Sequence, residues 1–374
     1  MNVATLTKPI GYPVSIASVD EGWVRNALES RFPDIVLRKI TRERVIGGTA
    51  TKILFSLETE SRDGVASLPD RICVKGLFDE NIRAYFKSEA QGSDWDVATL
   101  FVMEVSFYRD MPDRLGIPLP ECLLAIENGK DGVLILEDLS ARDVVFCDAR
   151  TPWSAGQAAR MLRVFARMHA KTWGWKPGAL PWIELGSRPA RESLPALMSG
   201  DRFDELLARP QIRSFIPAGY GDRERLLRGL RNLWAQDDRS EWLALGHGDA
   251  HVGQTYIEPD GSCAMLDWQT AAIMPWSKDV AYFLGGALTV PDRREHEREL
   301  LEYYLQQLTA EGGPVLDRAA AWDEYRAQML QGVVWPFITE QLHLIEVISA
   351  MSERFLTAMG DLDPLAVIEA RAER

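Results

Sequence analysis

The feature that most constrains the fold of this chain is a change along the sequence from strand-like to helix-like spacing of its apolar residues. The first third carries short β-prone runs separated by turn signals, whereas the chain from about residue 139 onward shows mainly helical spacing of apolar residues. Strands followed by a long helical region are typical of an α+β protein rather than of alternating βαβ units. A chain of 374 residues is also longer than a domain with one hydrophobic core usually is. We therefore expect a small, mostly antiparallel sheet lobe over residues 1–138 and a larger, mainly helical lobe over residues 139–374.

The expected sheet lobe contains five strands and one important helix. The predicted strands are residues 38–46, 51–59, 71–76, 121–127 and 132–137. Gly47-Gly48-Thr49-Ala50 separates the first two runs and predicts a hairpin turn. Apolar residues spaced three and four apart over residues 96–110 predict a helix, and this spacing places Glu104 on its buried face.

The helical region begins with a strong amphipathic pattern over residues 154–173, for which Ser154 is a plausible N-cap. From Ser277 to the end the pattern is almost purely helical, with interruptions near Gly312-Gly313-Pro314 and at Pro336. Small ligands usually bind in clefts between two lobes. The chemistry is therefore expected where the sheet lobe meets the helical lobe.

Composition excludes several classes of function. Because 42 Lys and Arg face 55 Asp and Glu, the net charge is −13, and no nucleic-acid partner is expected. No apolar run is long enough to span a bilayer, and the first residues do not resemble a signal peptide, so no membrane partner is expected. The four cysteines lie far apart, which suits a reducing compartment. These features predict a cytoplasmic protein, and none of them indicates an oligomeric state.

The most informative segment runs from His247 to Trp268. Asp249 and Asp267 are separated by a strand, a Pro-Asp-Gly turn and a second strand. A hairpin of this length returns the chain beside its start, so both carboxylates are expected at the same open end of the hairpin. Phosphoryl transfer needs such a pair, because one carboxylate orients the attacking hydroxyl and another holds the metal that bridges the phosphates.

The same segment has a rival interpretation. His247, Asp249 and His251 alternate in a pattern that can bind a transition metal, and Asp267 could complete a hydrolase site. The chain has only five histidines, and the other three lie near no further carboxylate motif. We therefore keep the metal-dependent hydrolase as the weaker alternative.

The segment resembles the catalytic loop of the aminoglycoside phosphotransferase and choline kinase-like superfamily, which includes the ecdysteroid kinase-like proteins. That family has HGDxHxxN followed by a strand and [IL]D[FW]. This chain matches at His247, Gly248, Asp249 and His251, and Leu266-Asp267-Trp268 matches the second motif, but Gln254 replaces the asparagine. Downstream, Lys278-Asp279-Val280-Ala281-Tyr282 resembles the family's structural Asp at the start of a helix.

The resemblance implies further parts upstream, and the sequence contains them in the same order. Lys75 resembles the strand-borne lysine that contacts the α- and β-phosphates, and Glu104 resembles its ion-pair partner. Gly47, Gly48 and Thr49 would cover the phosphates. The segment from Glu137 to Leu139 resembles the hinge whose backbone meets the adenine. The match spans roughly residues 40 to 285.

Each of these upstream signals has a plainer interpretation when it stands alone. A double glycine is usually only a hairpin turn, and a strand lysine such as Lys75 is usually an exposed edge residue. Glu137 and Asp138 could be solvated loop charges. His169, on the apolar face of the helix over residues 154–173, is interpreted as a structural histidine whose hydrogen bonds are satisfied.

As a whole, the resemblance implies a bilobal, protein-kinase-like fold that transfers the γ-phosphate of ATP or GTP to a hydroxyl of a small metabolite or antibiotic. Asp249 would be the catalytic residue, and Asp267 with Gln254 would hold Mg²⁺. The apolar C-terminal helices favour a hydrophobic hydroxylated substrate, although its identity is not encoded in any motif. Because Gln254 departs from the family pattern, a nucleotide-binding pseudokinase or sensor with impaired metal binding is the main alternative.

Overall fold

The structure is a computed structural model that describes residues 10–61, 67–89, 96–186, 188–198 and 200–372. The chain divides into two compact units, one formed by residues 1–114 and 119–144 and the other by residues 115–118 and 145–374. The change of unit after residue 144 comes a few residues later than the boundary expected after residue 138. Asp138 pairs with Arg71 of the sheet and caps the 3₁₀ turn Leu139–Ala141, which belongs to the first unit.

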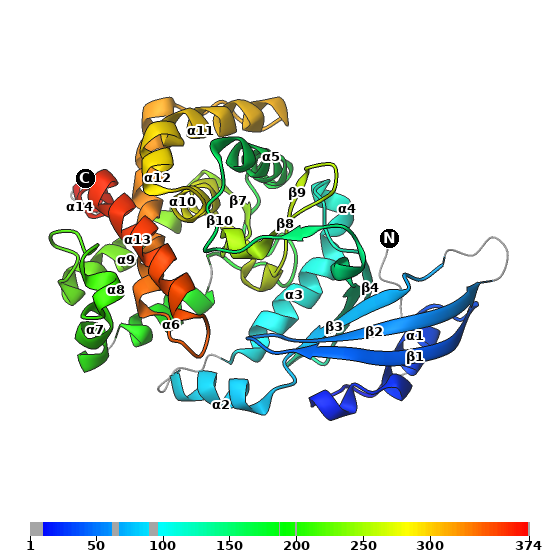
Figure 1. The fold of residues 1–374 in the computed structure, drawn as a ribbon. Helices are drawn as coiled ribbons and strands as arrows, with labels where there is room; N and C mark the ends of the chain where they lie inside the picture. Colours follow the sequence, from blue (N-terminus) through cyan, green and yellow to red (C-terminus); the bar gives the residue numbers. More distant parts are fainter. Residues whose placement is uncertain (1–9, 62–66, 90–95, 187, 199, 373–374) are drawn as a thin grey trace. The chain divides into compact units, whose positions relative to one another are not determined.

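The first unit is built on a five-stranded antiparallel sheet with the strand order β1-β2-β3-β5-β4 (Figure 1). Its strands are β1 (Ile35–Ile46), β2 (Thr51–Ser61), β3 (Arg71–Gly76), β4 (Cys122–Glu127) and β5 (Gly132–Glu137). The five expected strands are thus confirmed, and their ends shift by no more than three residues. The helices of this unit are α1 (Glu21–Arg31), α2 (Glu80–Glu89) and α3 (Ala98–Asp110).

Helix α3 packs against strands β4 and β5. A Cβ atom at Gly132 would lie 2.3 Å from the carbonyl oxygen of Phe101, so only glycine permits this close approach of helix and strand. The opposite layer contains α1, whose Val24, Ala27 and Leu28 are buried in one cluster with sheet residues. Full burial of a valine or leucine side chain such as Val24 or Leu28 contributes about 1.5–3 kcal/mol of transfer free energy.

The second unit is mainly helical, as expected. Its first long helix, α5 (Ala155–Thr172), begins at the predicted N-cap, where Ser154 and Gln157 form a reciprocal capping box. The other helices before the site are α6 (Arg188–Leu197), α7 (Gly200–Leu207), α8 (Pro210–Arg213) and α9 (Arg223–Asp237). In the sequence, the short helix α4 (Pro112–Leu115) contains the change from the first unit, which includes Arg114, to the second, which includes Leu115.

Two small sheets carry the polar segment. Strand β7 (Leu243–Gly246) pairs with β10 (Ala272–Pro275), and β8 (Thr255–Ile257) lies between β6 (Val145–Phe146) and β9 (Cys263–Met265). The remaining helices are α10 (Trp276–Ala287), α11 (Val290–Ala310), α12 (Arg318–Gln328), the 3₁₀ segment η5 (Met329–Phe337), α13 (Ile345–Leu362) and α14 (Pro364–Ala372). Both predicted interruptions are confirmed, since α11 ends before Gly312 and η5 contains Pro336.

Candidate functional site

A buried carboxylate from helix α10 holds the backbone of the polar loop. Asp279 accepts the N–H groups of His247 and Gly248, at 2.7 and 2.9 Å, and lies 3.4 Å from Nε2 of His169. Burial alone would raise the pKa of Asp279, but the hydrogen bond and charge of His169, with the charge of His247, bring it below the ordinary value. Asp279 is therefore an ionised anchor for the loop.

His169 is fully partnered, as the sequence analysis inferred. Its Nδ1 lies 2.8 Å from the hydroxyl of Tyr304, and its Nε2 faces Asp279. This arrangement fits the tautomer in which Tyr304 donates to Nδ1 while Nε2–H donates to the carboxylate. The chain Tyr304–His169–Asp279 thus supports the loop from three different helices.

Gly248 makes the turn of the loop possible. Its φ of +85° favours glycine, and a Cβ atom there would lie 2.4 Å from the carbonyl oxygen of Thr270. Beside it, the His247 ring bridges two backbone groups, because Nε2–H donates to the Leu266 carbonyl at 2.8 Å and Nδ1 accepts the Asp249 N–H at 3.3 Å. The ring thereby ties the start of the loop to the end of strand β9.

The β8–β9 hairpin brings Asp249 and Asp267 to one place, as its length predicted. Nε2 of Gln254 lies 3.5 Å from Oδ2 of Asp249 and 3.4 Å from Oδ2 of Asp267. Asp267 has a left-handed backbone with φ of +64°, a conformation that Asp tolerates better than most residues and that is often found at functional sites. One amide therefore lies between the two carboxylates.

These three side chains suit a hard cation. They offer carboxylate and amide oxygens, which are the ligands that Mg²⁺ prefers. A half-turn of the Gln254 amide would direct its oxygen, rather than its nitrogen, to the space between the carboxylates. Among the described residues there is no group of three or more His, Cys, Asp or Glu side chains arranged to hold a metal. Magnesium is compatible with so few protein ligands, because it usually keeps waters and substrate phosphates as well.

His247 and His251 have protein groups as partners for most of their ring nitrogens. Both nitrogens of His247 face backbone groups, and Nδ1 of His251 accepts the Gly253 N–H at 3.1 Å. Nε2 of His251 lies 3.6 Å from Asp249, and burial lowers the pKa of His251, although the charge of Asp249 opposes this shift. This geometry speaks against the hydrolase alternative.

Asp249 is accessible and has an aromatic neighbourhood that the sequence did not suggest. Its side chain is 37% exposed, so a ligand can reach the carboxylate. Burial, the charge of Asp249 and a hydrogen bond with it raise the pKa of Tyr282 well above its ordinary value. Trp335 packs edge-on to His251 and lies against His343. Burial lowers the pKa of His343, and the charge of Asp249 opposes that shift.

Within the first unit, Lys75 and Glu104 form a buried ion pair. Nζ of Lys75 lies 2.7 Å from Oε1 of Glu104, and the side chains are 5% and 2% exposed. Strand β3, which carries Lys75, is the middle strand of the sheet, so the plainer interpretation as an exposed edge lysine is wrong. Burying two charges costs free energy, so a contribution to stability does not by itself explain why this ion pair is buried.

The remaining predicted residues also lie in the first unit. Gly47, Gly48 and Thr49 form the β1–β2 turn, in which Gly48 has a φ of +146°. Glu137 ends β5 and Leu139 starts the following 3₁₀ turn. The N–H groups of Glu137 and Asp138 donate to the carbonyls of Glu121 and Arg71. The expected hinge contact therefore depends on the other backbone groups of this segment, and it stays a prediction.

Glu137 and Asp138 are not solvated loop charges. Asp138 is buried and paired with Arg71, and Glu137 pairs with Arg142. The roles proposed for the site residues in binding nucleotide and metal remain predictions. Their local geometry within each unit agrees with those roles.

Comparison with known proteins agrees with the resemblance. The sequence profile of the ecdysteroid kinase-like family matches residues 221–312, which include the whole polar loop, the hairpin and helix α10. No curated protein has a significantly similar sequence. Among the residues described, no helix combines the length and apolar character needed to cross a bilayer.

Solved structures of small-molecule kinases share the fold. Choline kinase from Cryptosporidium parvum superposes with a TM-score of 0.51 at 12% identity, covering 94% of this chain and 95% of its own. Choline kinase from Streptococcus pneumoniae gives a TM-score of 0.48 at 12% identity over 92% and 98% of the two chains. An amicoumacin kinase in complex with AMP-PNP, Ca²⁺ and amicoumacin gives 0.47 at 16% identity over 93% and 96%. The match to the Cryptosporidium choline kinase shows that the chain has an α+β, protein-kinase-like fold. The match to the ecdysteroid kinase-like profile over residues 221–312 bears out the resemblance to the aminoglycoside phosphotransferase and choline kinase-like superfamily.

Proposed function

We propose that this protein is a small-molecule kinase that transfers the γ-phosphate of ATP or GTP to a hydroxyl group. The observation that carries the proposal is the convergence of Asp249 and Asp267 on the amide of Gln254, in a loop whose backbone is anchored by Asp279. A choline kinase shares the fold over 94% of the chain, which supports a small alcohol as the acceptor.

In this proposal each residue has a defined role. Asp249 aligns the acceptor hydroxyl and takes its proton late in the transfer, because its carboxylate is exposed enough to meet a ligand. Asp267 and Gln254 would hold Mg²⁺, which when bound neutralises charge on the phosphates. Lys75 contacts the α- and β-phosphates, and Glu104 keeps its ammonium in place. The Gly47–Thr49 turn covers the phosphates, and the hinge at Glu137 to Leu139 meets the base.

The acceptor is proposed to be a small, at least partly hydrophobic compound. Support comes from the aromatic rings near Asp249. Tyr282 hydrogen-bonds its carboxylate, and Trp335 packs on His251 and His343. The acidic composition and the four cysteines, which are free thiols, support a cytoplasmic protein with small-molecule rather than nucleic-acid partners.

A second candidate function is a nucleotide-binding pseudokinase or sensor. The amide nitrogen of Gln254 lies within hydrogen-bonding distance of both carboxylates, so Gln254 can occupy the space that a metal needs. An asparagine, shorter by one methylene, would leave more of that space open. The kinase and the pseudokinase therefore predict different effects of Gln254→Asn on activity.

The test is transfer of labelled γ-phosphate from ATP and GTP to a panel of amino alcohols, amino sugars and apolar alcohols, with and without Mg²⁺. The kinase proposal predicts Mg²⁺-dependent labelling of an acceptor, reduced at least about 100-fold by Asp249→Ala. Asp260→Asn, an exposed change in the β8–β9 turn, serves as the matched control. An inactive wild type that is switched on by Gln254→Asn would instead establish the pseudokinase.

A further inference from the structure

The face of the sheet that carries Lys75 also carries a second lysine. Strands β2 and β3 are antiparallel neighbours (Figure 1), and their register places Lys52 directly opposite Lys75. Residues that are directly opposite in such a pair have Cβ atoms about 4.5–5.5 Å apart and point to the same side of the sheet. Lys52 is half-buried. The two ammonium groups therefore lie on one face, within reach of a single ligand.

The buried neighbours of the two lysines identify this face. Ile53 follows Lys52 and Val74 precedes Lys75, and both neighbours are fully buried in the cluster that contains residues of helix α1. Successive side chains of a strand point to opposite faces, so the two lysines point away from α1. Burial raises the pKa of the Cys73 thiol, and the charges of Lys52 and Lys75 both oppose that shift. Both ammonium groups therefore lie close to that thiol, as the register implies.

This arrangement of charges favours a ligand with several negative charges. Two like charges that face each other across a strand pair destabilise the sheet. Glu104 already holds the Lys75 ammonium at 2.7 Å. A ligand with a row of negative groups can meet both ammonium groups at once and relieve their repulsion, which a singly charged ligand does less well. A chain of phosphates has this property.

The position of Lys52 in the chain also suits a phosphate contact. Lys52 is the second residue of β2, and it follows Thr49, the last residue of the turn expected to cover the phosphates, by three positions. A Cβ atom at Gly47 would meet no other atom within 4 Å, so the turn is open at this point. Lysine binds phosphate well, because its compact ammonium carries three donors on a flexible stem.

We propose that Lys52 is a second phosphate-binding lysine, which together with Lys75 makes this site prefer nucleoside diphosphates and triphosphates over monophosphates. The inference rests on the nucleotide binding that the proposed function includes, and it does not depend on phosphate transfer. It therefore holds for the kinase and for the pseudokinase alike. The two ammonium groups would contact neighbouring phosphate groups of one chain.

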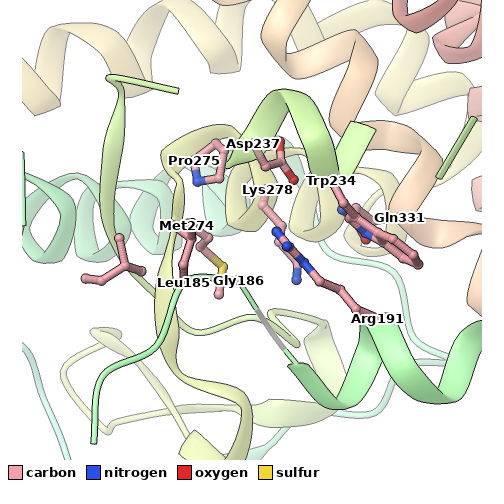
Figure 2. Close-up of a pocket in the computed structure, with 10 residues that line it drawn as sticks. Leu185, Gly186, Arg191, Trp234, Asp237, Met274, Pro275, Lys278 and Gln331 are labelled. Atoms are coloured by element: carbon pink, nitrogen blue, oxygen red, sulfur yellow. The ribbon is translucent and has the colours of Figure 1, made fainter. Parts of the chain in front are cut away.

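Lys278, a buried lysine of the helical unit, has a different setting. Figure 2 shows it beside Arg191 and Asp237, in a small hollow that has room for little more than a water molecule. Burial lowers the pKa of Lys278, and three carboxylates oppose that shift, those of Asp279, Asp237 and Asp249. Because carboxylates of the protein compensate Lys278 and no ligand fits beside it, the inference does not extend to this lysine.

The test measures binding of adenosine, AMP, ADP and ATP, and of the guanosine series, to the full chain by isothermal titration calorimetry with Mg²⁺ present. Lys52→Met should weaken the binding of ADP and ATP at least 10-fold, because a charge-assisted contact with phosphate is lost. The nucleoside should bind as before, and AMP should lose less affinity than ATP. Lys52→Arg keeps the charge and should retain most of the ATP affinity. Lys130→Met, the same change at an exposed lysine of the β4–β5 turn, is the matched control.

The dependence on ionic strength gives a second measure that a structural role of Lys52 would not change. The ATP affinity of the wild type should fall more steeply with sodium chloride than that of Lys52→Met, because one charge fewer is screened in the variant. Binding of the nucleoside also reports on folding, since a poorly folded variant would lose it as well. Lys52→Gln, with a polar side chain, repeats the comparison in that case.

Three outcomes would overturn the inference, and they separate its failure from that of the proposed function. Equal ATP affinity in the wild type and Lys52→Met would remove Lys52 from the phosphate site and leave the proposed function intact. Equal losses of ATP and nucleoside in both Lys52→Met and Lys52→Gln would make Lys52 a structural residue. A wild type that binds no member of either series would overturn the inference and the proposed function together.

Discussion

Replacing the loop anchor tests how the polar loop is held. Asp279→Asn keeps the size of the side chain but removes its charge and turns one acceptor oxygen into a donor. In the wild type the two oxygens accept the N–H groups of His247 and Gly248, and one of them also faces His169. The asparagine oxygen can satisfy only part of this set, and its NH₂ group must face another donor.

The loss of stability that Asp279→Asn causes follows from these contacts. One hydrogen bond to a charged group, worth about 1.5–3 kcal/mol, is lost, and one buried donor is left unsatisfied at about 1–3 kcal/mol. We therefore expect Asp279→Asn to lower the free energy of unfolding by about 2.5–6 kcal/mol. If the loop loosens as well, phosphate transfer falls far more than this loss of folded protein explains.

Urea unfolding followed by tryptophan fluorescence measures this cost, with Asp260→Asn as the exposed control, which keeps its turn and should behave as wild type. A double-mutant cycle with His169→Gln should show coupling, because His169 donates to the same carboxylate. If Asp279→Asn changed stability by less than about 1 kcal/mol, or added independently to His169→Gln, the carboxylate would not be the anchor that the geometry implies.

Three further predictions concern other buried groups. Lys75→Met and Glu104→Leu should each lower the free energy of unfolding by about 3–5 kcal/mol in chemical denaturation, because each leaves a buried charge unpaired. The double variant should cost much less than the sum of the two, because no charge remains unpaired; strict additivity would contradict this. Burial raises the pKa of Asp237 from its ordinary 3.8 to about 7, so folding takes up a proton. The contribution of Asp237 to stability therefore falls as pH rises from about 4 to 7 and is constant above. Asp237→Asn should therefore raise the melting temperature relative to wild type more at pH 8 than at pH 5, and an equal shift at both would refute it. Gly248→Ala should cost about 3 kcal/mol or more, measured by urea unfolding, because it combines a left-handed φ with a clash at Thr270; wild-type stability would show that the turn can relax.

The parts of the fold that were predictable have strong local signals. Strands β3 and β5 were predicted to the residue, because turn residues flank short β-branched runs. Helix α5 was predicted from its period and its cap. The sequence does not predict helix α1, although Asp20 caps it, because its apolar pattern of Val24, Ala27 and Leu28 is short.

The candidate site likewise has a part that the sequence predicts and a part that it does not. The meeting of Asp249 and Asp267 followed from the length of one hairpin, which is a local property. The contact of Tyr282 with Asp249 joins positions 33 apart on separate elements, and no spacing rule connects them.

Metal binding tests the central claim most directly. Mn²⁺ replaces Mg²⁺ in many phosphate-transfer sites and can be followed by electron paramagnetic resonance with a non-hydrolysable ATP analogue. The proposed site predicts that wild type binds Mn²⁺ in the presence of the analogue, that Asp267→Asn weakens this binding at least 10-fold, and that Asp260→Asn in the same hairpin leaves it intact. Equal Mn²⁺ affinity in wild type and Asp267→Asn would contradict the account.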